Sequence, residues 1–179
     1  MLKLKPPIRK PVIVLLLALL PSFFLLTFKG KMTDASAHAG NVTLVIDPGH
    51  GGIDGGAQGA DGSRESDINL AIALKLRALA EFYGQDNIMT RQDDSTKSDT
   101  PNYSEHRDLE CRTEIVNEAP NPVLISIHQN CFPTGVPSGP QVMYAATQDS
   151  EEFGKLTHGN LIRSLAPENR RVAEPASKG

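Results

Sequence analysis

The chain has 179 residues, of which 39% are hydrophobic and 22% charged, and its formal net charge is −3. This length suits one domain with a buried core, and this composition excludes a disordered chain. Six basic residues and one acidic residue precede Gly40, which leaves 12 basic and 20 acidic residues in the remainder, a net charge of −8. A domain with this negative charge repels polyanions, which argues against a nucleic-acid partner.

The first 39 residues have the order of an export signal. Basic residues precede a 17-residue apolar run, Val12–Phe28, which is at the lower limit of the length that spans a bilayer. Small-x-small triplets follow at residues 35–37 and 37–39, and either could be cleaved. A cleaved signal peptide and an uncleaved membrane anchor, each followed by a linker, therefore both stay open. Both place residues 40–179 outside the cytoplasm, in the cell envelope or beyond it.

The first half of this body predicts a strand, a glycine-rich loop and a helix. Residues 42–46 are apolar and β-branched, which favours a buried strand. Seven of the 14 residues from Gly49 to Gly62 are glycine, which indicates a loop. Ser66 is placed to cap a helix that continues to about Tyr83. The residues expected on the buried face of this helix are Ile68, Ile72, Leu79 and Phe82.

The alternation continues with a short strand over 87–91 and a helix over 104–118, whose expected buried residues are Leu109, Ile115 and Val116. A second strongly apolar strand follows at 123–127, then a strand at 141–145 and a helix at 150–164. No strand is predicted in the last fifteen residues. The order indicates a single α/β domain over residues 40–179, with a largely parallel or mixed sheet of about four strands flanked by helices.

Two histidines follow the two strongest strands directly. His50 comes after the first strand and His128 after the second. Because ligands bind at the carboxyl ends of strands in open α/β sheets, the two imidazoles are expected at one edge. Glu65, between the glycine loop and the helix, could add a carboxylate oxygen. Two histidines and one glutamate leave a zinc coordination position for water, as hydrolytic sites require.

Each of these features also has an ordinary structural explanation. A histidine after a strand is often only hydrogen-bonded, and a glutamate at a helix start serves the helix dipole. The glycine run lacks the spacing of phosphate-binding loops. The histidines in linker or helix contexts are expected at the surface: His38, His106 and His158. Cys131 is not expected to bind the metal, and whether it pairs with Cys111 outside the cytoplasm stays open.

Three segments in order resemble the zinc-dependent N-acetylmuramoyl-L-alanine amidases of the type-3 family. They are the segment from Val45 to Gly52, Glu65 followed by Asn69-Leu70-Ala71, and Ser126-Ile127-His128. The resemblance covers roughly residues 41–173. The segments 126–130 and 139–144 look most like the membrane-anchored sporulation and germination amidases of spore-forming bacteria.

The resemblance implies a zinc amidase fold in which His50, Glu65 and His128 hold the zinc. The substrate would be peptidoglycan, and the bond cut would join the lactyl group of N-acetylmuramic acid to the L-alanine of the stem peptide. In the sporulation subgroup this prepares muramic-lactam formation in the spore cortex. Asn130, close after His128, could touch substrate or cap the loop.

One part of the family pattern is missing. The family carries a further glutamate on a late strand, in a Glu-x-Gly-Phe-type segment, as its general acid/base, and neither Glu168 nor Glu174 matches that segment. We therefore expect the catalytic glutamate to lie beyond Gly179 and the catalytic domain to be incomplete. Two alternatives to an amidase stay open: an inactive protein that binds zinc or peptidoglycan, and a zinc peptidase that cuts within the stem peptide.

Overall fold

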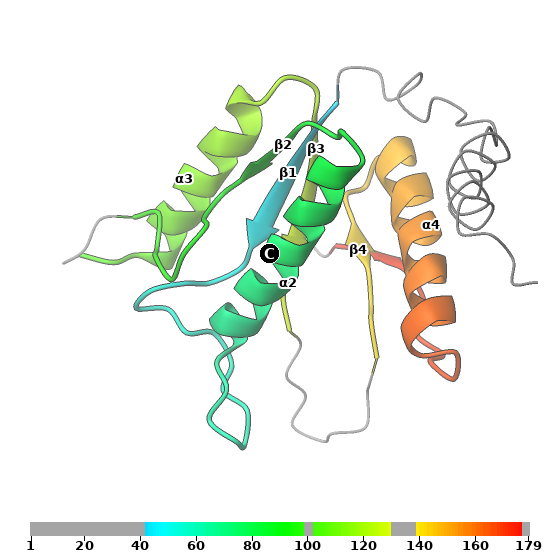
Figure 1. The fold of residues 1–179 in the computed structure, drawn as a ribbon, viewed down its shortest axis with the longest axis horizontal. Coiled ribbons are helices and arrows are strands. Elements are labelled where there is room, and N and C mark those ends of the chain that lie inside the picture. Colours follow the sequence, from blue (N-terminus) through cyan, green and yellow to red (C-terminus); the bar gives the residue numbers. More distant parts are fainter. Residues whose placement is uncertain (1–41, 99–101, 130–138, 177–179) are drawn as a thin grey trace, which may run out of the picture.

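The structure, a computed structural model, describes residues 42–98, 102–129 and 139–176. Its centre is a three-stranded parallel sheet in which β1 (Thr43–Pro48) lies between β2 (Asn87–Met89) and β3 (Pro122–Ile127) (Figure 1). Val45 and Ile46 of β1 are fully buried, as expected for the central strand of a parallel sheet. The predicted α/β class and the parallel pairing are confirmed.

Helix α2 (Glu65–Phe82) connects β1 to β2 and packs against both strands, crossing in front of the sheet in Figure 1. Its first residue follows Arg64, whose side chain makes no cap hydrogen bond. Ser66 is buried inside the first turn, so the prediction that it caps the helix is wrong. The backbone N–H of Ser66 donates to the carbonyl of Gly55. The glycine loop therefore accepts a hydrogen bond from the first turn of the helix, in place of a capping side chain.

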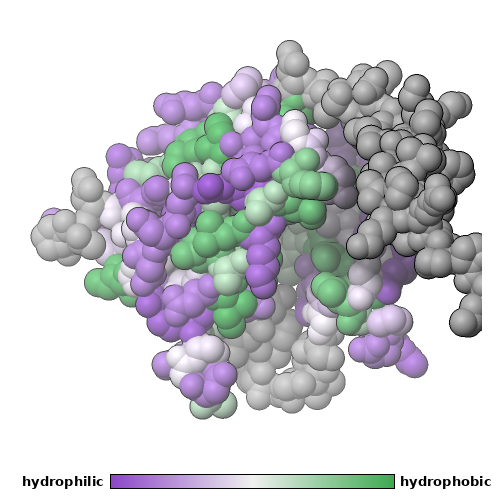
Figure 2. Space-filling view, in the orientation of Figure 1, coloured by the Kyte–Doolittle hydropathy of each residue, from purple (hydrophilic) through white to green (hydrophobic). Residues whose placement is uncertain are grey.

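The predicted buried face of α2 is also wrong. Ile68, Ile72, Leu79 and Phe82 are 38–81% exposed, and the buried residues are small or polar: Glu65, Ser66, Asn69, Ala73 and Ala80. Ala73 contributes to the core with Ile46 and Met89, since a small side chain lets the helix backbone approach the sheet closely. Apolar side chains consequently remain at the surface, as the green patches of Figure 2 show.

Helix α3 (Glu105–Glu118) leads from β2 to β3 and packs against β3. Ser104 is its N-cap and accepts a hydrogen bond from the N–H of Arg107 at 3.4 Å. The buried positions are Asp108 and Arg112, whereas Leu109 is exposed and Ile115 and Val116 are half-buried. The apolar residues of this helix therefore did not predict its inner face, because that face forms an ion-paired network instead.

The remaining elements form a separate parallel pair. β4 (Met143–Tyr144) is followed by α4 (Gln148–Leu165), which packs against it, and by β5 (Glu174–Pro175), which pairs with β4 (Figure 1). The prediction that the last fifteen residues hold no strand is therefore wrong, and so is the expectation of one sheet of about four strands within the described residues.

The inner face of α4 buries Gly154 and His158, which are four residues apart. A Cβ at Gly154 would lie 2.9 Å from the Cβ of Tyr144 on β4, so the helix is in close contact with that strand. The prediction that His158 lies at the surface is wrong because it occupies this face one turn further along.

None of the helices that the structure describes is both long and apolar enough to cross a membrane. The Val12–Phe28 run and His38 lie outside the described residues. The choice between a cleaved signal and an anchor therefore stays a prediction, as does the division of the chain at residues 39 and 40.

Candidate metal centre

His50, Glu65 and His128 come together at the edge of the sheet. Each offers one ligand atom, and these atoms all lie within 4.8 Å of one another. Glu65 Oε1 lies 3.3 Å from His50 Nε2 and 3.1 Å from His128 Nδ1. The two imidazole centroids are 4.9 Å apart, with the rings nearly perpendicular. The three residues expected from the sequence therefore form one compact group that could hold a metal ion.

The parallel register of β1 and β3 produces this meeting. Asp47 is paired with Ser126 and Pro48 with Ile127, so that both strands end at the same edge. The N–H of Gly49 extends the ladder by donating to the carbonyl of Ile127 at 2.9 Å. His50 and His128 are the next side chains beyond this point. The glycine loop then returns to the same edge, where α2 begins with Glu65 (Figure 1).

The orientation of His50 is fixed by Asp54. His50 has a left-handed backbone conformation, with φ of 61°, and its Nδ1 lies 2.8 Å from Asp54 Oδ2. That carboxylate also accepts from the hydroxyl of Tyr103 and from the N–H of Gly56, each at 3.0 Å. When Nδ1 donates to a carboxylate, Nε2 is left as the ligand nitrogen, and Nε2 is the atom that faces Glu65.

Hydrogen bonds around Asp54 shift the pKa values of Asp54 itself and of Tyr103. Burial raises the pKa of the Asp54 carboxyl, but bonds from His50, Gly56 and Tyr103 outweigh it and leave this pKa below its ordinary value. Burial and the bond to Asp54 raise the pKa of Tyr103 to about 12. Tyr103 is therefore a neutral donor at physiological pH and Asp54 is an anion beside His50.

Glu65 is held as a carboxylate. Its side chain is only 5% exposed, and burial raises its pKa, but hydrogen bonds from Ala57, Gln129 and Asn69 overcome this and lower the pKa below its ordinary value. The N–H of Ala57 donates to Oε2 at 3.0 Å and the N–H of Gln129 to Oε1 at 2.9 Å. An ionised carboxylate between two imidazoles is the charge state that a divalent cation requires.

Two glycines let the backbone approach these side chains. A Cβ on Gly49 would lie 2.1 Å from His128 Cε1, a severe overlap. Gly56 has φ of 65°, and a Cβ there would lie 2.7 Å from His50 Cδ2 and 2.9 Å from Glu65 Oε2. The glycine loop is thus required by close packing against the group, in addition to its role as a connection.

The donor set fits zinc. Two imidazole nitrogens and one carboxylate oxygen are a common ligand set of hydrolytic zinc sites. The side chain of His128 is 48% exposed and that of His50 is 24% exposed, so the group opens to solvent on the histidine side. A metal here would have room for water or a substrate oxygen.

Comparison with known proteins agrees with this geometry. A family model described as N-acetylmuramoyl-L-alanine amidase (Amidase_3) matches residues 44–177. The chain belongs to this amidase family. The Bacillus subtilis germination-specific N-acetylmuramoyl-L-alanine amidase is 34% identical over 134 residues, covering 72% of this chain and 56% of that protein. Escherichia coli AmiA is 35% identical over 144 residues, covering 80% of this chain and 44% of that protein. The chain therefore spans about half the length of these curated relatives.

Solved amidase structures have the same fold. The CwlD amidase from Clostridioides difficile, determined in complex with the GerS lipoprotein, superposes with a TM-score of 0.72 and 38% identity, over 76% of this chain and 73% of that one. AmiC2 of Nostoc punctiforme superposes with a TM-score of 0.63 and 27% identity, over 76% of this chain and 70% of that one. The family match over residues 44–177 includes nearly all of the three-stranded sheet and the group of His50, Glu65 and His128.

Other residues considered from the sequence do not belong to the group of His50, Glu65 and His128. His106 is exposed on α3, and Glu168 and Glu174 are exposed far along the chain. Asn130 and Cys131 lie outside the described residues, so the substrate contact of Asn130 and the pairing of Cys131 with Cys111 stay predictions.

The sequence did not identify the residues that support the group of His50, Glu65 and His128. Asp47 at the end of β1 accepts hydrogen bonds at 2.6 Å from Thr90, Ser126 and Arg112. Burial raises the pKa of Asp47, and these three partners reverse the effect and lower it. The available signal was the position of Asp47 directly after a run of apolar residues, because a charge that is buried with such a strand requires hydrogen-bonding partners.

Proposed function

We propose that this chain is a zinc-dependent N-acetylmuramoyl-L-alanine amidase that hydrolyses the amide between the lactyl group of N-acetylmuramic acid and L-alanine in peptidoglycan. The observation that carries the proposal is the group of His50, Glu65 and His128, whose ligand atoms lie within 4.8 Å of one another. Membership of the amidase family supports the choice of substrate. Bound zinc would supply a Lewis acid for the amide carbonyl and for water.

The residues of the chain have distinct tasks in this proposal. His50 presents Nε2 to the metal because Asp54 holds its Nδ1 at 2.8 Å. Glu65 presents its carboxylate, which the N–H groups of Ala57 and Gln129 hold in place. His128 is the third ligand and lies on the open side, where a polymeric substrate can approach. We assign no described residue to general acid/base catalysis.

The relatives and the N-terminal segment support a proposal about the biological setting. One curated relative is named a germination-specific amidase, and the segment before residue 40 has the pattern of an export signal or membrane anchor. We propose that the protein acts in the bacterial cell envelope, on spore cortex or vegetative wall, reached through this N-terminal segment.

The decisive test incubates the full chain with purified peptidoglycan and follows the appearance of new L-alanine amino termini. We expect hydrolysis by the zinc-loaded chain, about 10²–10⁴-fold slower than with the general acid/base glutamate that the family pattern places beyond Gly179, and none by His128→Ala. His106→Ala is the matched control, because this histidine is exposed on α3 and does not belong to the group.

The products separate the proposal from its two alternatives. New amino termini within the stem peptide, in place of L-alanine, would identify a peptidase. Binding of peptidoglycan without any new amino terminus would identify a wall-binding protein. Activity of His128→Ala equal to that of the unaltered chain would show that this group is not the catalytic centre.

A further inference from the structure

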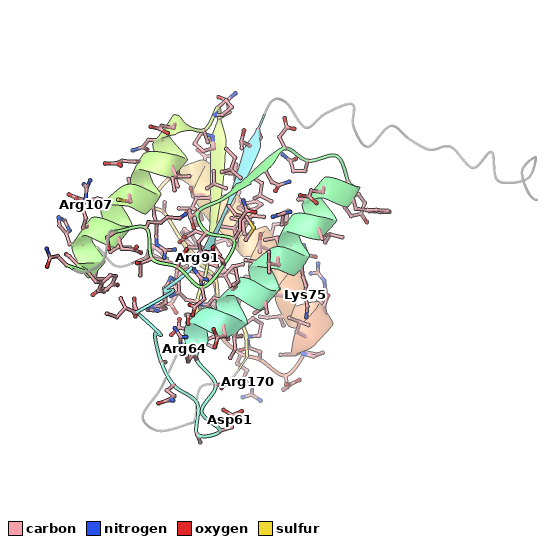
Figure 3. All side chains as sticks on the ribbon, turned by 60° about the vertical axis from the view of Figure 1, so that its left-hand side comes forward. Asp61, Arg64, Lys75, Arg91, Arg107 and Arg170 are labelled. Atoms are coloured by element: carbon pink, nitrogen blue, oxygen red, sulfur yellow. The ribbon has the colours of Figure 1, made fainter. Side chains whose placement is uncertain are left out.

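Two buried arginines lie beneath the loop that carries His50. Arg91 follows β2 and is 1% exposed, and Arg112 in α3 is 5% exposed. Figure 3 shows Arg91 in the interior between α2 and α3, whereas Arg107 extends from the outer side of α3. Because a buried guanidinium is costly unless its N–H groups are paired, the partners of these two side chains show what they hold.

Arg91 binds main-chain carbonyls. Its Nε donates to Pro48 at 2.9 Å, and its Nη2 donates to Gly49 at 3.0 Å and to Ser66 at 2.9 Å. Pro48 and Gly49 immediately precede His50, and Ser66 immediately follows Glu65. Arg91 therefore joins the segment of one candidate ligand to the segment of another through hydrogen bonds to main-chain carbonyls.

Arg112, on α3, binds the same loop. Its Nη1 donates to Pro48 at 2.9 Å and its Nη2 to the carbonyl of His50 itself at 2.8 Å. The carboxylates of Asp47 at 2.6 Å and Asp108 at 2.7 Å balance its charge. The rigid planar fork of arginine can serve all these acceptors together, and lysine, with one compact ammonium, cannot.

The loop requires such restraint. Two residues after the end of β1, His50 has a left-handed backbone conformation, with φ of 61°. A non-glycine residue in this region costs free energy and persists only where the surrounding structure fixes it. Asn69 adds a further bond to Gly49 at 3.2 Å and accepts one from Gln129 at 3.1 Å, which links the His128 segment to the same carbonyl.

We propose that Arg91 and Arg112 are positioning residues of the metal centre: by fixing the main chain from Pro48 to His50 they set the distance between the imidazole of His50 and the carboxylate of Glu65. The inference rests on the metal centre proposed above. It differs from a purely structural role, in which the arginines stabilise the fold and leave the metal geometry unaffected.

The test compares Arg91→Lys and Arg112→Lys with the unaltered full chain. Arg107→Lys is the matched control, because Arg107 is exposed on the same helix as Arg112 and pairs with Glu110 at 3.0 Å. Zinc affinity is measured by competition with a chromogenic chelator, the site geometry by the visible spectrum of the cobalt-substituted protein, and stability by thermal unfolding of the metal-free chain.

We expect each of the two variants to bind zinc about 10–100-fold more weakly, the range found for residues that orient metal ligands. The cobalt spectrum should change, and Arg107→Lys should match the unaltered chain. Unchanged zinc affinity and spectrum would overturn the inference. The inference would also be overturned if the metal-free variants no longer folded, because the arginines would then be needed for the stability of the whole domain. Failure of the unaltered chain to bind zinc would instead refute the proposed metal centre.

Discussion

The Nδ1 atom of His50 lies 2.8 Å from Oδ2 of Asp54, a residue only four positions further along the chain. This pair decides which nitrogen of the imidazole faces Glu65. Asp54→Asn keeps the shape of the side chain but removes its charge. We expect zinc affinity to fall about 10–100-fold, because the carboxylate orients the ring and fixes which nitrogen is free to bind the metal.

Titration with zinc against a competing chelator measures the Asp54→Asn effect. Asp61→Asn provides a comparison within the same loop, because the carboxylate of Asp61 bonds to Ser63 and, among the residues described, to no candidate ligand. Equal affinities of Asp54→Asn and the unaltered chain would show that His50 is oriented by other contacts.

Adding one methyl group at Gly49 should damage the site without changing any ligand. A Cβ there would lie 2.1 Å from His128 Cε1, so the His128 ring must leave its position beside Gly49. We expect Gly49→Ala to lose zinc binding by more than tenfold, as measured by equilibrium dialysis. Gly159→Ala on α4 has only Arg163 nearby, at 3.6 Å, and should leave binding unchanged. Retained binding in Gly49→Ala would show that the His128 ring lies elsewhere.

Removal of the metal should lower thermal stability. A ligand that binds only the folded state at 100 times its dissociation constant stabilises that state by about 2.7 kcal/mol. We therefore expect a chelator to lower the unfolding temperature of the unaltered chain and to have no such effect on Glu65→Gln. Differential scanning fluorimetry with and without added zinc measures this. An identical chelator effect in both proteins would place the bound metal at another site.

Asp47 should make stability depend on acid pH. Because its pKa in the folded protein is lowered, its stabilising contribution is fully present above its unfolded-state pKa of about 3.9 and is lost as pH falls through the folded-state value. Asp47→Asn cannot titrate, and it leaves Arg112 with one fewer carboxylate. We expect it to cost about 3–5 kcal/mol at pH 7 and to flatten the decline of stability below about pH 4.

Urea unfolding at a series of pH values tests this prediction for Asp47. Ser126→Ala removes one of its three hydrogen bonds and should cost only about 1 kcal/mol, which provides a graded comparison. If Asp47→Asn and the unaltered chain lose stability in parallel between pH 7 and pH 3, other carboxylates cause the acid sensitivity.

The sequence predicted the meeting of His50, Glu65 and His128 better than the packing around them. Two apolar strands, each followed directly by a histidine, were sufficient to place His50 and His128 at one edge, because parallel strands in register must end together. The helix faces were predicted wrongly. In α2 the small residue Ala73 faces the sheet, and in α3 the inner face is Asp108 and Arg112, so apolar periodicity alone did not identify what is buried.

The supporting residues could not be predicted from local pattern. Arg91 binds the carbonyl of Pro48 and Arg112 that of His50, each more than 40 positions away in the sequence, and a main-chain acceptor leaves no trace in residue type. Asp54 lies in a loop where an aspartate usually serves a turn. The strand β5 was missed because two residues, one of them proline, carry almost no β-pattern.

The ligands of the proposed centre and the side chains that orient them all lie between Asp47 and Gln129, and none of their hydrogen bonds within the described residues reaches α4, β4 or β5. Zinc binding and hydrolysis of the wall can therefore be tested separately. We expect substitutions in α4, β4 or β5 to leave zinc affinity unchanged, whereas a hydrolysis assay responds to changes inside the proposed centre and outside it.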